Sequence, residues 1–560
     1  MKRSVKKLEI KGQMGGTPVG CVGLGSALAL TLAAASPARA QPVPGAGDAY
    51  ARWQAETDRS AESVPAEFKL INYFFMRGTL TNMVADPAGL RGVSLGPLGA
   101  GAGSATATGE DSTAYIEQRW IPVLSYSPWF IDGLATFRAQ FEIDYTWGQA
   151  ANQIQNNQGG GLNADQVNIQ TKNVNVSLYP TRNPLQLSVV LGTQPFYDNI
   201  DDPQTTSLFH IVKTGYKLAF LGTDGTGATA YGHFGDHRFK LGFLPIGSTQ
   251  PDKAEKNDPR LAYVTLLTAD YSHELRPGTE LGFSLWHLRD STEGKAFAFE
   301  GLVPSGPSSS GLFPYTGVAD LAIENPTGSV TWVGMNFNHN VDFRLGDVAF
   351  AAYAIANFGK FESQKKDTTL NRDIAIAGYA ADAEVAWNYG KTLGDVITAE
   401  ALITSGDDDV GDAEYNSVFT MNHYGLPGAV WFDHKTLLLF PFTSTVSNYT
   451  GAVTDISNQG YGLEAGILTG ATDLVADVLN LKLGVAAARS AVDPAPGAFN
   501  LKRGRTIGAE INAELKWNVR YLMTIGLHGG YLAVGDFFDA VPTVDANPWA
   551  AFTTFTWYGF

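Results

Sequence analysis

The feature that most constrains the fold is an alternation of apolar and polar residues over positions 134–147. The odd-numbered side chains from 137 on are apolar, namely Phe137, Ala139, Phe141, Ile143, Tyr145 and Trp147. The even-numbered side chains from 136 on are polar, namely Thr136, Arg138, Gln140, Glu142, Asp144 and Thr146. Because successive side chains of a β-strand point to opposite sides, this period of two predicts a strand with one apolar and one polar face.

The composition of the two faces indicates where such a strand lies. The apolar face ends in Tyr145 and Trp147, residue types that are enriched at membrane–water interfaces. The polar face carries charges of both signs, which suits a water-filled lumen. We therefore expect a strand of a transmembrane β-barrel, with Phe137, Phe141, Tyr145 and Trp147 facing lipid.

The same pattern recurs along the chain, in about eighteen predicted strands. Segments 375–389 and 506–519 repeat it clearly and place Trp387 and Trp517 among the lipid-facing residues. Only 17% of the residues are charged, and beyond residue 40 no apolar run approaches the roughly 20 residues of a transmembrane helix. The predicted fold class is all-β: residues 66–560 form one outer-membrane β-barrel of antiparallel strands.

Connections between the predicted strands alternate in length, and every second one is long. This alternation is typical of outer-membrane barrels, which have short periplasmic turns and longer extracellular loops. It places both chain ends on the periplasmic side. The chain ends in Phe560, with Tyr558 and Phe552 at alternate positions before it, and this resembles the C-terminal strand that outer-membrane proteins use as an insertion signal.

The N-terminal residues have the three parts of a secretory signal peptide. A basic segment over residues 2–11 precedes an apolar segment over 21–35, and Ala38, Arg39 and Ala40 form a small-residue cleavage site. We expect cleavage after Ala40, a periplasmic extension over 41–65 and a location in the outer membrane of a Gram-negative cell. Cys21, the only cysteine, lies within the removed segment, so the mature chain has no disulfide.

The charge of the chain restricts its partners. Removal of residues 1–40, which carry six basic residues and one acidic residue, changes the formal net charge from −16 to −21. An acidic chain disfavours nucleic acid as a partner. The expected partners are outer-membrane lipid, lipopolysaccharide and the barrel-assembly machinery, and no cofactor is expected.

Polar faces of the predicted strands supply candidate lumen-lining residues. They are Arg119, Arg138, Gln140, Glu142, Asp144, Arg238, Lys240, Glu384, Glu400, Glu510, Glu514 and Lys516. Two interpretations remain open. The lumen is either a mixed surface with ion pairs between strands, or a basic ladder that steers an anionic solute.

Two segments resemble the alginate-export family of outer-membrane porins. In 396–441 a strand ends in the sequence SGDDD and is followed by VFTMNHYGLPG and TLLLFP. The segment LGTQPFYDNIDD at 191–202 is similar to a strand-to-loop segment of the family, with Thr193 where an arginine is usual. The resemblance implies an eighteen-stranded monomeric barrel that exports an anionic polysaccharide through an Arg/Lys-lined pore, with a polysaccharide-export complex as partner. We carry over the fold and the channel, not the substrate.

Three classes of function stay open at this stage. The favoured one is a passive channel for a hydrophilic solute or a polysaccharide, and not an enzyme. The alternatives are an adhesin or structural barrel whose long loops 290–327 and 405–459 bind partners, and an outer-membrane hydrolase. Loops near 198–209 or 405–459 are candidates to fold inward and narrow the pore. The acidic cluster Asp407, Asp408 and Asp409 is a weak calcium candidate and otherwise a solvated loop tip.

Overall fold

The computed structural model describes residues 68–85, 105–107, 109, 112–148, 164–184, 186–197, 222–249, 262–293, 321–341, 343–409, 411–419, 436–439, 453–454, 458–496, 500–520, 522–539 and 541–559. All of them belong to one compact unit, Pro44–Phe560. The predicted signal peptide at 1–40, the extension at 41–65, the loop at 198–209 and the terminal Phe560 lie outside the described residues.

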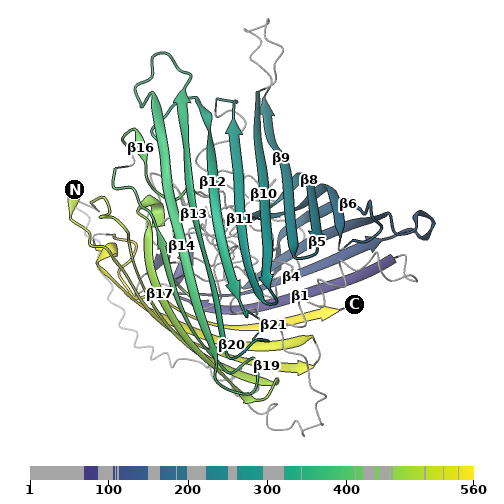
Figure 1. Ribbon diagram of the computed structural model, residues 1–560. Helices are drawn as coiled ribbons and strands as arrows, with labels where there is room; N and C mark the ends of the chain where they lie inside the picture. The colour runs from purple at the N-terminus through teal and green to yellow at the C-terminus, as the bar shows by residue number, and fades with distance from the viewer. Residues whose placement is uncertain are drawn as a thin grey trace, which may run out of the picture. The chain divides into compact units, whose positions relative to one another are not determined.

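In the described part of the chain, eighteen antiparallel strands form one closed sheet. They are β1 (Phe68–Thr81), β4 (Thr113–Tyr126), β5 (Ala135–Gly148), β6 (Ala164–Leu178), β7 (Leu187–Tyr197), β8 (Gly222–Phe234), β9 (His237–Thr249), β10 (Ala262–Arg276), β11 (Thr279–Asp290), β12 (Pro326–His339), β13 (Val348–Ser363), β14 (Asp373–Asn388), β15 (Val396–Thr404), β17 (Leu463–Val475), β18 (Leu479–Arg489), β19 (Thr506–Arg520), β20 (Met523–Val534) and β21 (Trp549–Gly559). Each pairs with the strands before and after it (Figure 1).

The first and last strands of the sheet complete the ring. β1 pairs with β4 on one side and with the C-terminal β21 on the other, with Asn72 opposite Gly559 and Thr81 opposite Ala550. Closure joins the first strand to the last, so the ring has no free edge strand, which is the condition for a sheet inside a bilayer. The predicted fold class, an antiparallel barrel of about eighteen strands, is confirmed.

Shorter elements lie between these strands. They are β2 (Met83–Ala85), β3 (Ala105–Ala107), β16 (Glu414–Tyr415) and the 3-10 turns η2 (Trp129–Ile131), η3 (Asn458–Gly460) and η5 (Asp536–Phe538). β2 pairs with β3, and β16 runs parallel to β14. Among the residues that the structure describes, no helix is long and apolar enough to cross a membrane.

The ends of the barrel differ as the sequence predicts. Tight turns such as 235–236, 277–278 and 521–522 join the strands at one end, and longer connections such as 291–325 and 405–462 join them at the other. We call these the short-turn end and the long-loop end. Gly278 in one tight turn has a φ of 73°, a left-handed conformation that glycine adopts without strain.

Burial follows the period of two most clearly on β14 and β15. On β14, Tyr379, Val385 and Trp387 are 54%, 44% and 50% exposed, whereas Asp382 and Glu384 are 2% and 0% exposed. Apolar side chains thus face outward and charged ones inward, the reverse of a barrel that is soluble in water. An outward apolar surface on a closed ring of strands is the arrangement of a barrel that spans a bilayer.

Strand starts are the main difference from the sequence prediction. β6 begins at Ala164, whereas the alternation predicts a start near residue 172, and the predicted loop 148–166 is shorter. Two register shifts between β5 and β6, near Gln140 and Asp144, interrupt the period of two on the β6 side. Backbone pairing extends the strand through a polar segment that carries no clear alternation. For β8 the alternation predicts a start near residue 216. The strand is described from Gly222 on, and residues 216–221 lie outside the described part.

The interior near the long-loop end is apolar. Inward side chains of five consecutive strands contribute, namely Leu266, Trp286, Trp332, Phe361 and Ile376 of β10 to β14. Residues of the connection 405–462 belong to the same buried cluster, among them Tyr415, Phe419, Leu438 and Leu439. Parts of this connection therefore pack inside the barrel wall.

Candidate functional site

The inner wall carries a continuous row of polar and aromatic contacts across six neighbouring strands, β4, β1, β21, β20, β19 and β18. Its first member is a buried ion pair. Arg77 on β1 lies directly opposite Glu117 on β4, and its Nε and Nη2 donate to Glu117 Oε2 at 2.7 and 2.6 Å. The Arg77 guanidinium also lies 5.4 Å from the centre of the Phe552 ring on β21, a cation–π distance.

The row continues through a histidine on β20. The His528 ring stacks on Phe552 with the ring centres 4.6 Å apart. Its Nδ1 lies 2.7 Å from Oε2 of Glu514 on β19, and its Nε2 lies 3.0 Å from the hydroxyl of Thr554. Lys482 on β18 completes the row, because its Nζ donates to Glu514 Oε1 at 2.7 Å.

Most neighbours in this row lie directly opposite one another, whereas Arg77 lies opposite Thr554 and contacts Phe552 two positions away. Lys482 is the register partner of Glu514, Glu514 of His528, and His528 of Phe552. Cross-strand neighbours of opposite charge stabilise a sheet and fix the position of each charge. We name the residues Glu117, Arg77, Phe552, His528, Glu514 and Lys482 the polar row.

Of the polar row, only Glu514 is among the site residues predicted from the sequence. Arg77 is not, because the first strand reads as almost entirely apolar, and His528 is not, because the last strands contain many glycines. The nine histidines also show no metal-ligand spacing that would single out His528. The pairing of strands would identify both residues as candidates. Arg77 lies opposite Glu117, and His528 lies opposite Glu514.

A second group of charges lies on β9, β10 and β11. Lys240 Nζ is 3.2 Å from Asp270 Oδ2, and the indole Nε1 of Trp286 donates to Asp270 Oδ1 at 3.0 Å. Closer to the short-turn end, Arg238 forms an ion pair with Glu280. Both basic residues are candidates from the sequence. The structure gives Lys240 an acidic partner on the neighbouring β10 and gives Arg238 one on β11, beyond β10.

The wall formed by β14 and β15 is acidic. Glu384 and Glu400 lie directly opposite each other, and Asp382 is two positions along the same inward face of β14. All three are buried. Like charges in facing positions repel, so this part of the inner wall concentrates negative charge at three adjacent inward positions.

One inward segment is fixed to the wall by a single carboxylate. Glu510 on β19 accepts three consecutive backbone N–H groups, from Leu437 at 2.6 Å to Oε1 and from Leu438 and Leu439 at 3.0 and 2.7 Å to Oε2. Asn512 donates a fourth hydrogen bond at 2.8 Å. A carboxylate that binds several N–H groups is a strong, charge-assisted anchor.

The same connection touches the wall at a second place. The indole Nε1 of Trp332 on β12 donates to the carbonyl of Phe419 at 2.8 Å, and the Phe419 N–H donates to Asn357 Oδ1 on β13 at 3.1 Å. The two anchors lie on different parts of the ring. Of the two loops expected to fold inward, 405–459 contacts the inner wall at Phe419 and at residues 437–439, and 198–209 lies outside the described part.

The remaining candidate residues divide by burial. Gln140, Lys240, Glu384, Glu400, Glu510 and Glu514 are buried, whereas Arg119, Arg138, Arg238 and Lys516 are half-buried. Phe137 and Trp387 are exposed, and Phe141, Tyr145 and Trp517 are half-exposed. The side chains of Glu142, Asp144 and Trp147 lie outside the described part. Their roles as lining or lipid-facing residues stay predictions.

Tyr558 of the predicted insertion signal lies on the inward face of β21. It is buried with Ile71, Val123 and Leu522, and its ring centre is 4.9 Å from that of Tyr73. These contacts tie the last strand to β1 and β4. The role of Tyr558 and Phe560 in barrel insertion stays a prediction.

The acidic cluster 407–409 forms hydrogen bonds within its own loop. Asp407 is buried and accepts the N–H groups of Asp409 at 2.9 Å and Asn416 at 2.8 Å. Burial raises the pKa of the Asp407 carboxyl, although both hydrogen bonds oppose that rise. In the described part of the chain, no group of three or more His, Cys, Asp or Glu side chains is placed to hold a metal ion. Calcium binding stays a hypothesis.

Comparison with known proteins gives distant likenesses only. No family model and no curated protein matches the chain. Among solved structures, a BenF-like porin from Pseudomonas fluorescens Pf-5 has 10% identity and a TM-score of 0.44, over 88% of this chain and 98% of that one. OccAB1 of Acinetobacter baumannii has 11% identity and a TM-score of 0.44, over 88% and 97%. OccK5 (OpdH) of Pseudomonas aeruginosa has 11% identity and a TM-score of 0.43, over 88% of this chain and 99% of that one.

These scores assign the chain to no family. The alginate-export resemblance gains no support from the comparisons. A proposal for the function of the protein therefore depends on its own residues.

Proposed function

We propose that the protein is a passive channel of the outer membrane for a hydrophilic solute. The observation that carries the proposal is the contrast on β14 between exposed apolar residues outside and the buried charged residues Asp382 and Glu384 inside. Eighteen strands form a ring wide enough for an aqueous path, whereas eight are filled by side chains. A polar interior in such a ring is suited to selecting solutes by charge.

The charge distribution favours a solute with groups of both signs, or a small cation. The polar row holds fixed positive and negative groups, and the wall at Glu384 and Glu400 is acidic. A uniformly basic path, as an acidic polysaccharide requires, does not match this wall. The proposal of polysaccharide export rests only on the two sequence segments at 191–202 and 396–441.

Conductance across a planar bilayer tests the channel. The purified mature protein should open stable pores whose ion preference depends on the inward carboxylates of β14 and β15. Glu384→Gln combined with Glu400→Gln should reduce that preference, and Arg182→Gln at an exposed short turn should leave it unchanged. A protein that is folded in liposomes and conducts no ions would contradict the proposal.

A hydrolase is the second candidate, and one observation favours it. The Thr554 hydroxyl, the His528 ring and the Glu514 carboxylate are linked in the order nucleophile, base and acid. If Nδ1 donates to Glu514, then Nε2 accepts the Thr554 hydroxyl hydrogen, as a general base would. Gly526 lies against this contact, since a β-carbon there would be 2.2 Å from His528 Nε2 and 2.4 Å from Thr554 Oγ1.

The two functions are separated by one substitution. Thr554→Val removes the hydroxyl and keeps the shape of the side chain. A hydrolase would lose turnover of a soluble nitrophenyl ester and labelling by a fluorophosphonate, whereas a channel would keep its conductance. If the wild-type protein neither hydrolyses the ester nor reacts with the fluorophosphonate, the hydrolase is excluded. The contact among Thr554, His528 and Glu514 is then a structural hydrogen-bond network.

A further inference from the structure

The outer surface at the long-loop end carries a cluster of charges at the limit of the apolar belt. On β17 and β18 the outward residues Leu468, Leu483 and Val485 are 50%, 56% and 49% exposed. Farther toward the long loops, the outward positions of the same strands are Glu464 and Arg489. Four residues of strand span about 13 Å, so Arg489 lies about that far beyond Val485, where a lipid headgroup would be.

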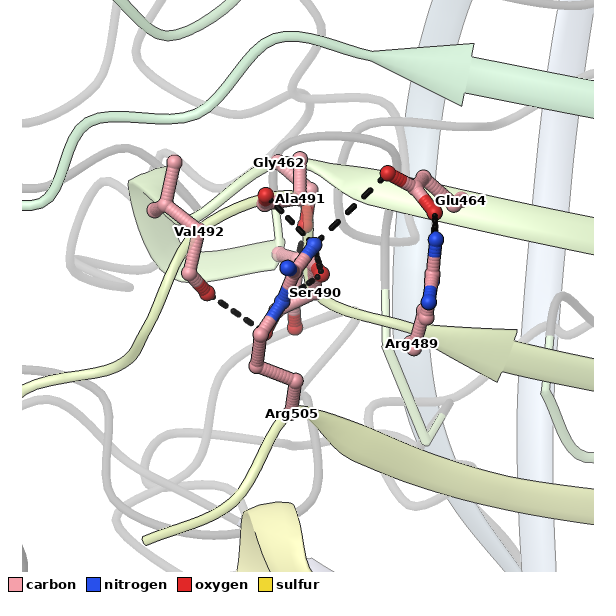
Figure 2. A network of polar contacts seen from close by, with 8 residues as sticks. Gly462, Glu464, Arg489, Ser490, Ala491, Val492 and Arg505 are labelled. Atoms are coloured by element: carbon pink, nitrogen blue, oxygen red, sulfur yellow. Dashed lines mark hydrogen bonds and ion pairs between the residues drawn. The ribbon is translucent and has the colours of Figure 1, made fainter.

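The cluster is held rigidly by contacts between three neighbouring strands (Figure 2). Arg489 lies opposite Glu464 in the β17–β18 ladder and forms an ion pair with its Oε2. Arg505, next to the start of β19, lies 3.6 Å from Glu464 Oε1. Its Nε and Nη2 donate to the carbonyl of Ser490 at 2.9 and 2.7 Å, and Nη2 donates to the carbonyl of Ala491 at 2.6 Å.

These contacts use only part of each guanidinium. Arg489 bonds Glu464 through Nε and Nη2, and Arg505 uses Nε and Nη2 in its contacts. Within the described part of the chain, the Nη1 groups of both residues have no partner. The Arg489 side chain is 60% exposed and that of Arg505 is 36% exposed. Two oriented cations therefore present unused donors to the outside.

The surrounding segment is basic in an acidic chain. Residues 489–505 contain four basic residues and one acidic residue, whereas the whole chain has a formal net charge of −16. Arg503 is turned away from this surface, because its Nε donates to the carbonyl of Phe537 at 2.6 Å. Lys502 and the apolar Leu501 are exposed beside it.

We propose that Arg489, Arg505 and Lys502 bind the phosphate group of a lipid in the leaflet on the long-loop side. A guanidinium with two free N–H groups matches a phosphate, and such charge-assisted bonds are strong. The ligand is an amphiphile rather than a soluble anion because the exposed Leu483, Val485 and Ile511, on the membrane side of the charges, offer its acyl chains an apolar surface. The proposal rests on the barrel spanning a membrane and does not depend on what passes through it.

Binding of lipid A to the purified protein in detergent micelles, measured by native mass spectrometry, tests the site. We use diphosphoryl lipid A, the same lipid without phosphates, and inorganic phosphate at equal concentration. Arg489→Gln combined with Lys502→Gln should weaken diphosphoryl lipid A binding about tenfold, since an ion-paired hydrogen bond contributes that much. Arg489→Lys keeps the charge without the planar fork and should give a smaller loss. Arg505 is left intact because it also holds the loop.

Arg182→Gln is the matched control, because Arg182 is an exposed arginine paired with Asp132 at the short-turn end. It should bind lipid A as the wild type does. Equal binding by wild type and by the Arg489→Gln, Lys502→Gln variant, or equal binding of both lipids, would overturn the proposal. Saturation by inorganic phosphate would identify a soluble-anion site instead and also overturn it. A protein that binds the lipid and conducts no ions contradicts only the proposed channel.

Discussion

Two parts of the inner wall follow the same period of two and hold opposite chemistry. From β18 through β21 and β1 to β4, the inward face carries the polar row. From β10 to β14, near the long-loop end, it carries a buried apolar cluster with Trp286 and Trp332 directly opposite each other. A residue that faces the inside of the barrel is thus not always polar. Its chemistry depends on what lies next to it.

The neighbour that makes the difference is the connection 405–462. Phe419 and Leu438 pack into the apolar part, so that the inward tryptophans lie in a protein core. The polar row instead satisfies its charges by pairs between adjacent strands. Apolar burial is non-directional and tolerates a packed segment, whereas buried charges require fixed partners. The two parts should therefore respond differently to substitution.

The largest effect should come from the apolar part. Trp332→Ala removes a fully buried indole and the hydrogen bond to the Phe419 carbonyl. We expect a loss of about 5 kcal/mol in the free energy of unfolding, from cavity formation and one unpaired carbonyl. Urea unfolding of the protein in liposomes measures it. The outward Trp387→Ala is the control and should lose much less, and equal losses would remove the distinction between inner core and outer belt.

The polar row should respond to the loss of one charge and tolerate the loss of both. Arg77→Gln leaves Glu117 buried without its cation and should reduce stability by about 3 kcal/mol. Arg77→Met with Glu117→Leu removes both charges at similar volume and should restore most of that stability. The same unfolding assay compares the two variants. If the double variant is the less stable of the two, the ion pair contributes more than its burial costs.

The Glu510 anchor joins the two parts, and its loss should have a smaller effect on stability. Glu510→Gln keeps the shape and replaces charge-assisted bonds to Leu437, Leu438 and Leu439 by weaker ones, which should cost about 2 kcal/mol. The segment should also become more accessible. A cysteine at Leu438 should react faster with a water-soluble reagent in the variant than in the wild-type background. Unchanged labelling would mean that apolar packing alone holds the segment.

The smallest effects should come from two carboxyls outside the membrane-spanning strands. At the short-turn end, the Asp395 carboxylate accepts N–H groups of Asp473, Lys391 and Thr392 and the hydroxyl of Thr472, and these bonds hold its pKa below the usual value. Its stabilising contribution is therefore present above about pH 4 and is lost as the pH falls through the lowered pKa. Burial raises the pKa of Asp407 at the long-loop end, so its contribution is present at low pH and is lost as the pH rises.

Thermal unfolding between pH 3 and pH 8 checks these signs. The stability of the wild type relative to Asp395→Asn should decrease as the pH falls. The stability of the wild type relative to Asp407→Asn should decrease as the pH rises. We expect less than about 1 kcal/mol for each, because solvent screens the exposed Asp395 turn and because the hydrogen bonds of Asp407 oppose the effect of its burial. If the stability difference from the wild type changes with pH in the same direction for both variants, the opposite pKa shifts assigned to Asp395 and Asp407 are wrong.

Much of the fold is readable from the sequence because alternation is local. The strands at 379–389 and 506–519 need only their own residues to show which face is apolar, and the burial patterns of β14 and of β19 from residue 509 on follow. At the start of β19 the prediction is wrong, because Ile507 is buried and Thr506 exposed next to a register shift. The early start of β6 is not readable in this way, since residues 164–171 have only Val167 and Ile169 as large apolar side chains and become a strand by pairing with β5. Boundaries of this kind depend on the neighbouring strand.

The candidate site is predictable in outline and not in its connections. Glu510 and Glu514 are both recognisable as inward glutamates on one strand, yet they do different things. Glu514 pairs with Lys482 and His528 on neighbouring strands, and Glu510 binds the backbone of a segment 71 to 73 residues earlier. No local pattern distinguishes them, because the partners are set by the register of the ring.

Strand number, the face that each strand presents and the alternation of short and long connections follow from the amino-acid sequence alone. These are properties of a period of two and of turn residues, which act over a few positions. Only the folded ring sets which inward positions hold charge pairs, which hold a core, and where the connection 405–462 is anchored. Those contacts join residues such as Arg77 and Phe552, or Trp332 and Phe419, which lie far apart in the chain and meet through closure of the ring and inward packing.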